Sequence, residues 1–271
     1  MFTPAPSRKF LLSVALWPAV AAPSPRVDPP PATLTVFAAA SLKDAFTQLT
    51  DTLERQTPGL KVRFNFAGSP NLALQIQQGA AADVFASADD RWMADVRDSG
   101  LVADTPRVFV QNRLVVIIPA SNPARIDRLQ DLARRGVKLV VAAAPVPAGR
   151  FAREMLSKLA HTDGFSSDFE ERALENVVSN EDNVKAVVAK VQLGEADAGV
   201  VYVSDVTPDV SRHVRRLTIP ESANVVARYP VAVLKRAANA AAARAFIELL
   251  LAPVGQRILQ LSGFIPVGPT S

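Results

Sequence analysis

The sequence contains no cysteine and only two histidines, His161 and His213. The lack of cysteine excludes disulfides, cysteine-ligated zinc, iron–sulfur clusters, a thiol nucleophile and a lipid-modified N-terminal cysteine. Two histidines leave little material for a histidine-rich metal site. Charge of neither sign dominates, because 30 basic residues stand against 26 acidic ones and the formal net charge is +4. That excess is too small to indicate a nucleic-acid partner.

Catalytic motifs are scarce as well, since no P-loop, G-x-G-x-x-G or H-E-x-x-H occurs. Ser41 follows a predicted strand and opens a predicted helix, as a hydrolase nucleophile does. Its flanks, Ala39 and Lys43, stand where a nucleophile elbow has glycines. His161 and His213 lie in polar segments typical of a surface. We therefore expect no enzyme and no cofactor, and keep a serine-dependent envelope hydrolase that uses Ser41 as an alternative.

The N-terminus has the pattern of an export signal. Arg8 and Lys9 precede an apolar stretch that ends in Ala19-Val20-Ala21, which predicts a cleavable signal peptide over residues 1–21. The stretch is shorter than the roughly 20 residues that span a bilayer. Residues 22–32 are rich in proline and predict a stiff leader. Export without a lipid anchor makes the periplasm the expected location.

Short apolar strands alternate with amphipathic helices along the rest of the chain, which is typical of an α/β fold. Strands are predicted at residues 33–38, 61–66, 83–86, 114–118, 139–143 and 198–203, and within 225–234. Helices are predicted to open near Ser41, Pro70, Asp89, Pro147 and Val184, and to cover residues 239–251 and 254–261. This order predicts sheets of mostly parallel strands flanked by helices.

The length after removal of a leader favours two lobes over one. The chain is expected to cross between them near Asn112 and again near Ala227. Lobe one would then comprise residues 33–112 plus 227–271, and lobe two residues 113–226, with a hinge between them. Such a fold binds ligands where the carboxyl ends of strands meet helix starts.

Several helices that follow strands begin with small, uncharged residues. Ser41 and Ser69 stand where an N-cap belongs, and Pro147-Ala148-Gly149 opens a third helix. A helix N-terminus presents unpaired amides and a partial positive charge, so these starts favour an anion.

An ordered set of segments strongly resembles the periplasmic molybdate-binding proteins of ABC importers. The segments run from Thr33 to Phe264 and include TVFAAASL at residues 35–42, FAGS at 66–69, ADVFASAD at 82–89, VPAG at 146–149, EADAGVVY at 195–202 and YPVAV at 229–233. The resemblance implies a two-lobed type II periplasmic binding protein fold, a molybdate ligand and a membrane permease as partner.

The resemblance also implies which residues hold the oxyanion. Ser41 and Ser69 would donate hydroxyl and amide hydrogens from lobe one. Ala148 and Val184 would donate backbone amides from lobe two, and Tyr202 its phenol. These five are oxyanion contacts, and none is a direct ligand of the metal. The family often carries another small or hydroxyl residue after Ser69, where this chain has Pro70 and one possible amide donor is lost.

Molybdate is a dianion at neutral pH and only accepts hydrogen bonds, so a ring of donors suits it. Tungstate is nearly the same size and should bind similarly, whereas sulfate has shorter bonds and would stretch a rigid ring. Glu181 and Asp182 precede Val184 and must point away from the anion. The alternatives are a binding protein for sulfate or another tetrahedral oxyanion, the hydrolase above, and an ion-sensing regulatory domain. We expect a monomer.

Overall fold

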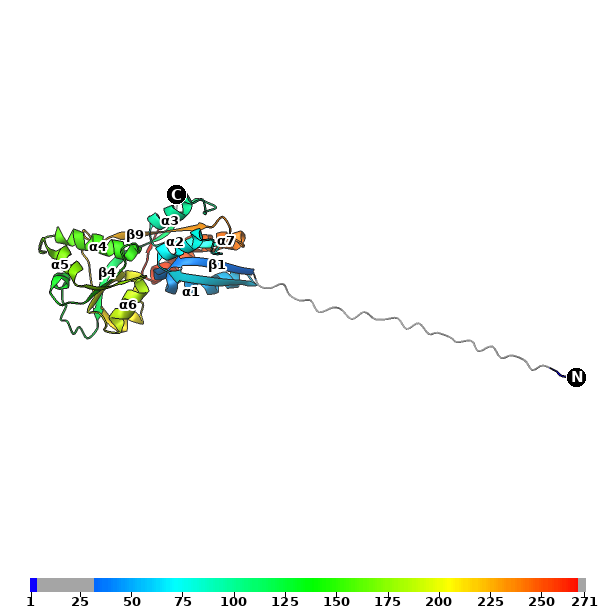
Figure 1. The fold of residues 1–271 in the computed structure, drawn as a ribbon, viewed down its shortest axis with the longest axis horizontal. Coiled ribbons are helices and arrows are strands. Elements are labelled where there is room, and N and C mark those ends of the chain that lie inside the picture. The colour runs from blue at the N-terminus through cyan, green and yellow to red at the C-terminus, as the bar shows by residue number, and fades with distance from the viewer. Residues whose placement is uncertain (4–31, 268–271) are drawn as a thin grey trace. The chain divides into compact units, whose positions relative to one another are not determined.

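The computed structural model describes residues 1–3 and 32–267 (Figure 1). The signal peptide predicted over residues 1–21, apart from Met1 to Thr3, lies outside the described residues. So does the predicted leader except Ala32, which opens the first strand. The elements that follow all belong to one unit, Pro31–Ser271. No helix in the described part combines the length and the apolar character that crossing a membrane requires.

Ten strands of the described residues form one curled sheet in the order β2-β1-β3-β9-β4-β7-β5-β6, and β8 and β10 both pair with β4. Their bounds are β1 Ala32–Ala39, β2 Leu60–Ala67, β3 Val84–Ala86, β4 Arg107–Pro119, β5 Leu139–Ala142, β6 Val177–Glu181, β7 Ala198–Tyr202, β8 Val214–Leu217, β9 Val226–Val233 and β10 Ile265–Pro266.

Strand β4 divides the sheet into two halves. From Arg107 to Arg113 it pairs with β9, and from Leu114 to Pro119 it pairs with β7 and β8. We call the part with β1, β2, β3, β9 and β10 the β1 half, and the part with β5 to β8 the β5 half. Strand β1 is parallel to β2 and β3, and β5 is parallel to β6 and β7. Every antiparallel pair involves β4 or β9, and β4 is the strand that pairs in both halves.

Helices cover both halves of the sheet. Figure 1 shows α1, α2 and α7 around the β1 half, and α4, α5 and α6 around the β5 half. The bounds are α1 Lys43–Gln56, α2 Ser69–Gln77, α3 Asp90–Asp98, α4 Pro147–Ala160, α5 Phe169–Glu175, α6 Val184–Gln192, α7 Ala240–Leu251 and α8 Pro253–Leu261. A 3₁₀ turn, η1 at Ala40–Leu42, joins β1 to α1, and another, η3 at Val203–Asp205, follows β7.

Aromatic packing fixes α1 against the sheet. Phe46 of α1 meets Phe246 of α7 edge to face at a ring separation of 5.2 Å, and its ring lies tilted to that of Phe109 of β4 at 5.8 Å. All three side chains are buried. Edge-to-face pairs add to the stabilisation from buried area. This packing sets the position of the η1 turn at the start of α1, and with it the position of Ser41.

The alternation of strands and helices that the sequence predicts is confirmed at each predicted element, with small shifts of the ends. The structure adds α5, β6, β8 and β10, which the sequence analysis left out. Two predicted caps are wrong. Ser41 lies inside η1 and makes no side-chain cap. Ser69 is the first residue of α2, whose cap position is Gly68. Both hydroxyls are engaged by tertiary contacts that local sequence does not reveal.

Candidate functional site

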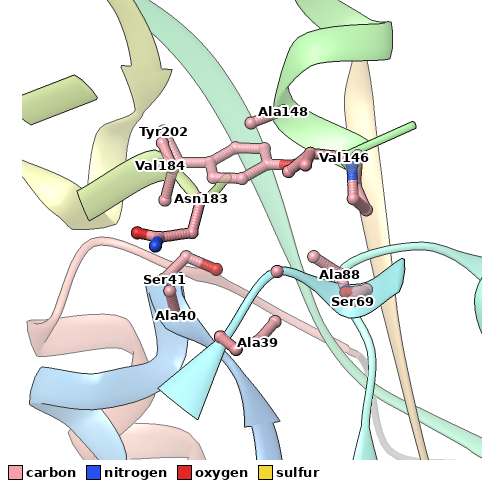
Figure 2. A pocket seen from close by; sticks show the side chains of 13 residues that line it. Ala39, Ala40, Ser41, Ser69, Ala88, Val146, Ala148, Asn183, Val184 and Tyr202 are labelled. Carbon is pink, nitrogen blue, oxygen red and sulfur yellow. The ribbon is translucent and has the colours of Figure 1, made fainter. Parts of the chain in front are cut away.

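All five predicted site residues line one pocket between the two halves. Figure 2 shows Ser41 and Ser69 on the side of the β1 half, and Ala148, Val184 and Tyr202 on the side of the β5 half. The cavity volume is about 10 Å³, which is room for about one water-sized sphere. A space of this size leaves no room for a sugar or a peptide in this arrangement.

Two serine hydroxyls face the pocket from the β1 half. Ser41 Oγ lies 2.9 Å from the hydroxyl of Tyr229 on β9, and both residues are buried. Ser69 Oγ accepts a hydrogen bond from the Ala88 amide at 3.1 Å. Because an accepting hydroxyl keeps its own hydrogen, Ser69 can still donate to a ligand. Ser41 can do the same when the Tyr229 hydroxyl is the donor of their shared bond.

Two helix starts face the pocket from the β5 half. Ala148 is the second residue of α4, directly after Pro147, and Val184 is the first residue of α6. Amides in the first turn of a helix have no intrahelical acceptor, and the helix dipole makes that end positive. Neither helix carries an acidic residue in its first turn. Both ends are therefore suited to an anion.

Glycine allows α4 to start close to the end of β5. A Cβ at Gly149 would lie 2.1 Å from the Ala142 carbonyl oxygen and 2.2 Å from that of Ala143. A real side chain cannot be that close, so only glycine lets the first turn rest on these two carbonyls. This close approach positions the neighbouring Ala148 amide at the pocket.

Tyr202 ends β7 and brings an unpartnered hydroxyl into the pocket. Its side chain is 1% exposed, and among the described residues its hydroxyl oxygen has no hydrogen-bond partner. Burial raises the pKa of Tyr202 well above its usual range, and the neighbouring Tyr229 and the carboxylates of Asp89 and Asp205 act in the same direction. The phenol therefore stays protonated and remains a donor. Leaving a buried polar group unpaired costs about 1–3 kcal/mol, which a bound acceptor would recover.

Among the residues that the structure describes, no Lys, Arg, His, Asp or Glu lines this pocket. Two nearby buried carboxylates are paired elsewhere, Asp89 with Arg150 and Asp205 with Lys185. Glu181 lies 2.9 Å from Lys190, and Asp182 is exposed. The pocket is thus a set of hydrogen-bond donors beside helix N-termini, without a full countercharge. Such an environment favours a small anion that accepts hydrogen bonds and carries no proton.

Neither a metal-ion site nor a serine nucleophile is supported by the described residues. Within residues 1–3 and 32–267 there is no group of three or more His, Asp or Glu side chains that could hold a metal ion. Ser41, the candidate nucleophile of the alternative hydrolase, bonds Tyr229, whose pKa is raised by burial. A group that holds its proton so strongly is a poor general base near neutral pH.

Sequence reasoning overlooked three residues that shape this site. Tyr229 belongs to the YPVAV segment, yet no role was inferred for it from the sequence, because its contact with Ser41 joins residues 188 positions apart. Asn183 caps α6 by accepting from the Ala186 amide at 3.2 Å, which an asparagine before an apolar run could have suggested. Gly68 lies where a Cβ would be 2.3 Å from the Asp182 carbonyl oxygen of the opposite half.

Comparison with known proteins agrees with this architecture. Residues 34–265 match the family described as bacterial extracellular solute-binding protein. The molybdate-binding protein ModA of Mycobacterium tuberculosis is 43% identical over 231 residues, which cover 85% of this chain and 84% of that protein.

Two solved structures share the fold at lower identity. The periplasmic molybdate-binding protein of Azotobacter vinelandii is 21% identical with a TM-score of 0.74, and the match covers 87% of this chain and all of that one. The sulfate-binding protein SubI of Mycobacterium tuberculosis is 20% identical with a TM-score of 0.76, and covers 88% of each chain. The predicted two-lobed binding-protein fold is confirmed, and the chain belongs to the bacterial extracellular solute-binding proteins and, among them, to the family of the molybdate-binding protein ModA.

Proposed function

We propose that this protein captures molybdate, and also tungstate, in the pocket between its halves and delivers the anion to the membrane permease of an ABC importer. The halves act as the two lobes, residues 33–112 plus 227–271 and residues 113–226, which close by a hinge at β4 and β9. The signal peptide over residues 1–21 sends the chain to the periplasm. The mature protein acts there as a monomer, without a cofactor and without catalysing a reaction.

The observation that carries the proposal is the buried, unpartnered hydroxyl of Tyr202 in a pocket lined by donors. A dianion that accepts hydrogen bonds would satisfy this hydroxyl and the free amides of Ala148 and Val184 together. Ser41 and Ser69 would complete the set from the other lobe. A protonated anion such as phosphate would bring a donor of its own, which this set cannot accept.

The donor set is sufficient for tight binding. Hydrogen bonds to a charged group contribute about 1.5–3 kcal/mol each, so about seven give roughly 10–20 kcal/mol before the cost of association. That cost is at least about 4 kcal/mol. A sub-micromolar Kd needs about −8 kcal/mol. The energies leave room for such an affinity with hydroxyls and amides alone.

Relatives named for molybdate support this ligand over other oxyanions. The fold alone does not, because the chain shares it with a sulfate-binding protein. Sulfate has the same charge and shape as molybdate with shorter bonds. Discrimination between them therefore depends on how rigidly the donors are spaced, and a sulfate-binding function is the second candidate.

Isothermal titration calorimetry tests the proposal on protein freed of ligand by unfolding and refolding. Molybdate, tungstate, sulfate and phosphate are titrated separately. We expect tight one-to-one binding of the first two, far weaker binding of sulfate and none of phosphate. Tight sulfate binding with no response to molybdate would show that sulfate is the ligand, and it would leave the fold assignment unchanged. No heat from any of the four, with folding verified by circular dichroism, would refute the proposed site.

A separate measurement addresses location. The full chain is expressed in a Gram-negative host, and the mature N-terminus is determined by mass spectrometry of the periplasmic fraction. Cleavage after Ala21 is expected. Uncleaved protein in the cytosol would refute the predicted signal peptide.

A further inference from the structure

Ion pairs join the two halves on either side of the pocket. Lys185 Nζ of α6 lies 2.7 Å from Asp44 Oδ2 of α1, across the boundary between the halves. On the other side, Arg150 Nη2 of α4 lies 3.1 Å from Asp89 Oδ2, which caps α3.

The pair of Asp44 and Lys185 is close to the site in sequence and in space. Lys185 directly follows Val184, whose amide faces the pocket, and Asp44 follows Ser41 by three residues. Figure 2 shows Ser41 and Val184 at the same end of the pocket, one from each half, with Ala88 and Val146 at the other end. Any movement that separates Ser41 from Val184 must therefore also separate Asp44 from Lys185.

A third group keeps Lys185 in position within its own half. Asp205, in the η3 turn after β7, lies 3.2 Å from Lys185 Nζ and is fully buried. Lys185 is 25% exposed and Asp44 40% exposed. Burial opposes the charge of Lys185, yet Asp205 and Asp44 outweigh it and raise the pKa of Lys185. Lys185 thus has one partner that stays with it and one that belongs to the opposite half.

We propose that the ion pair between Asp44 and Lys185 is a closing contact, which forms when the lobes close over the anion and slows its release. This inference rests on the proposed function, because it assumes that the pocket between the halves holds the ligand. Both residues are positioning residues: neither is among those that line the pocket, and each acts by holding one lobe against the other.

Removal of the negative charge of Asp44 tests the proposal, because repulsion and a closing contact predict opposite changes in affinity. A negative charge one helical turn from Ser41 repels a bound dianion, so repulsion alone predicts tighter binding when that charge is removed. A closing contact predicts the opposite, because removal leaves the closed arrangement without its link to Lys185. Truncating one partner of such a pair mainly raises the dissociation rate.

The experiment measures Kd by calorimetry and the dissociation rate by stopped flow for Asp44→Asn. The probe is molybdate, or whichever of tungstate and sulfate the wild-type protein binds most tightly. Asp51→Asn is the matched control, since Asp51 is an exposed residue of the same helix and the change in net charge is equal. We expect Asp44→Asn to raise Kd and the dissociation rate about 3- to 30-fold. The control should stay within about twofold of the wild type.

A double-mutant cycle with Lys185→Met isolates the pair. In that background the repulsion remains and the contact is gone, so adding Asp44→Asn should leave Kd unchanged or lower it. Equal weakening by Asp44→Asn in both backgrounds would overturn the inference, as would unchanged or tighter binding in the single variant. If Lys185→Met fails to fold, the sign of the Asp44→Asn effect still decides. Absence of anion binding by the wild-type protein would instead refute the proposed function, and the inference with it.

Discussion

Gly68 lies against the backbone of the opposite half, and an alanine there should hold the two halves apart. A Cβ at this position would be 2.3 Å from the Asp182 carbonyl oxygen, whereas ordinary contact begins at 3.4 Å. The opposing atom belongs to the backbone, just before the Asn183 cap of α6, and has little freedom to move away. The two lobes should therefore remain about 1 Å further apart than in the closed arrangement.

The cost follows from the donors that this displacement moves. A hydrogen bond near 2.9 Å that lengthens by about 1 Å is lost, because N–H···O bonds extend only to about 3.2 Å. Lobe two contributes Ala148, Val184 and Tyr202. Loss of one or two of these bonds to a charged acceptor costs about 2–6 kcal/mol. We expect Gly68→Ala to raise the Kd for molybdate at least about 30-fold.

Thermal unfolding without ligand provides the control. Gly68 has φ −63° and ψ 141°, which alanine adopts without strain. Replacing glycine at such a position stabilises a protein by about 0.4–1 kcal/mol through the unfolded state. We therefore expect a melting temperature equal to or above that of the wild type together with much weaker binding by calorimetry. Wild-type affinity in a folded Gly68→Ala protein would refute the closed geometry on which the proposed site depends.

Three further predictions concern the hydroxyls of the site. Tyr202→Phe removes the buried hydroxyl that has no partner in the structure and would donate to the anion. Kd should therefore rise about 10- to 100-fold, while the melting temperature without ligand stays level or rises. Weaker binding together with a lower melting temperature would contradict this role. Tyr229→Phe removes the partner of the Ser41 hydroxyl and should raise Kd about fivefold, measured by the same calorimetry, and an unchanged Kd would show that Ser41 is positioned by the backbone alone. Affinity should be flat from pH 6.5 to 9, because burial raises the pKa of Tyr202 well above its ordinary value and the phenol keeps its proton in the folded state. The stability that this protonated group contributes is fully present below the ordinary tyrosine pKa of about 10 and is lost as the pH rises through the raised pKa of the folded state. A steep fall in affinity below pH 9 would contradict the assignment.

Local sequence was sufficient for much of the framework. The alternation of apolar strands and amphipathic helices predicted the order of elements, because periodicity depends on neighbouring residues only. Pro147 and Val184 were correctly predicted to open α4 and α6. The two cap predictions at Ser41 and Ser69 failed, since their hydroxyls meet Tyr229 and Ala88, far along the chain.

The candidate site, like the fold, was predictable only where it depends on local sequence. The sequence shows that several helices after strands begin with small, uncharged residues, and its resemblance to molybdate-binding proteins points to five particular residues. A free amide at a helix start is a local property, so it can be predicted from a few residues.

Only the tertiary structure decided how those groups act together. It brings the five residues into one pocket, leaves the Tyr202 hydroxyl buried and unpaired, and sets Gly68 against the Asp182 carbonyl. It also joins Asp44 to Lys185 across 141 positions. The physical reason is that pocket size, burial and contact across the lobes depend on how distant segments pack, and no local pattern of residues specifies that packing.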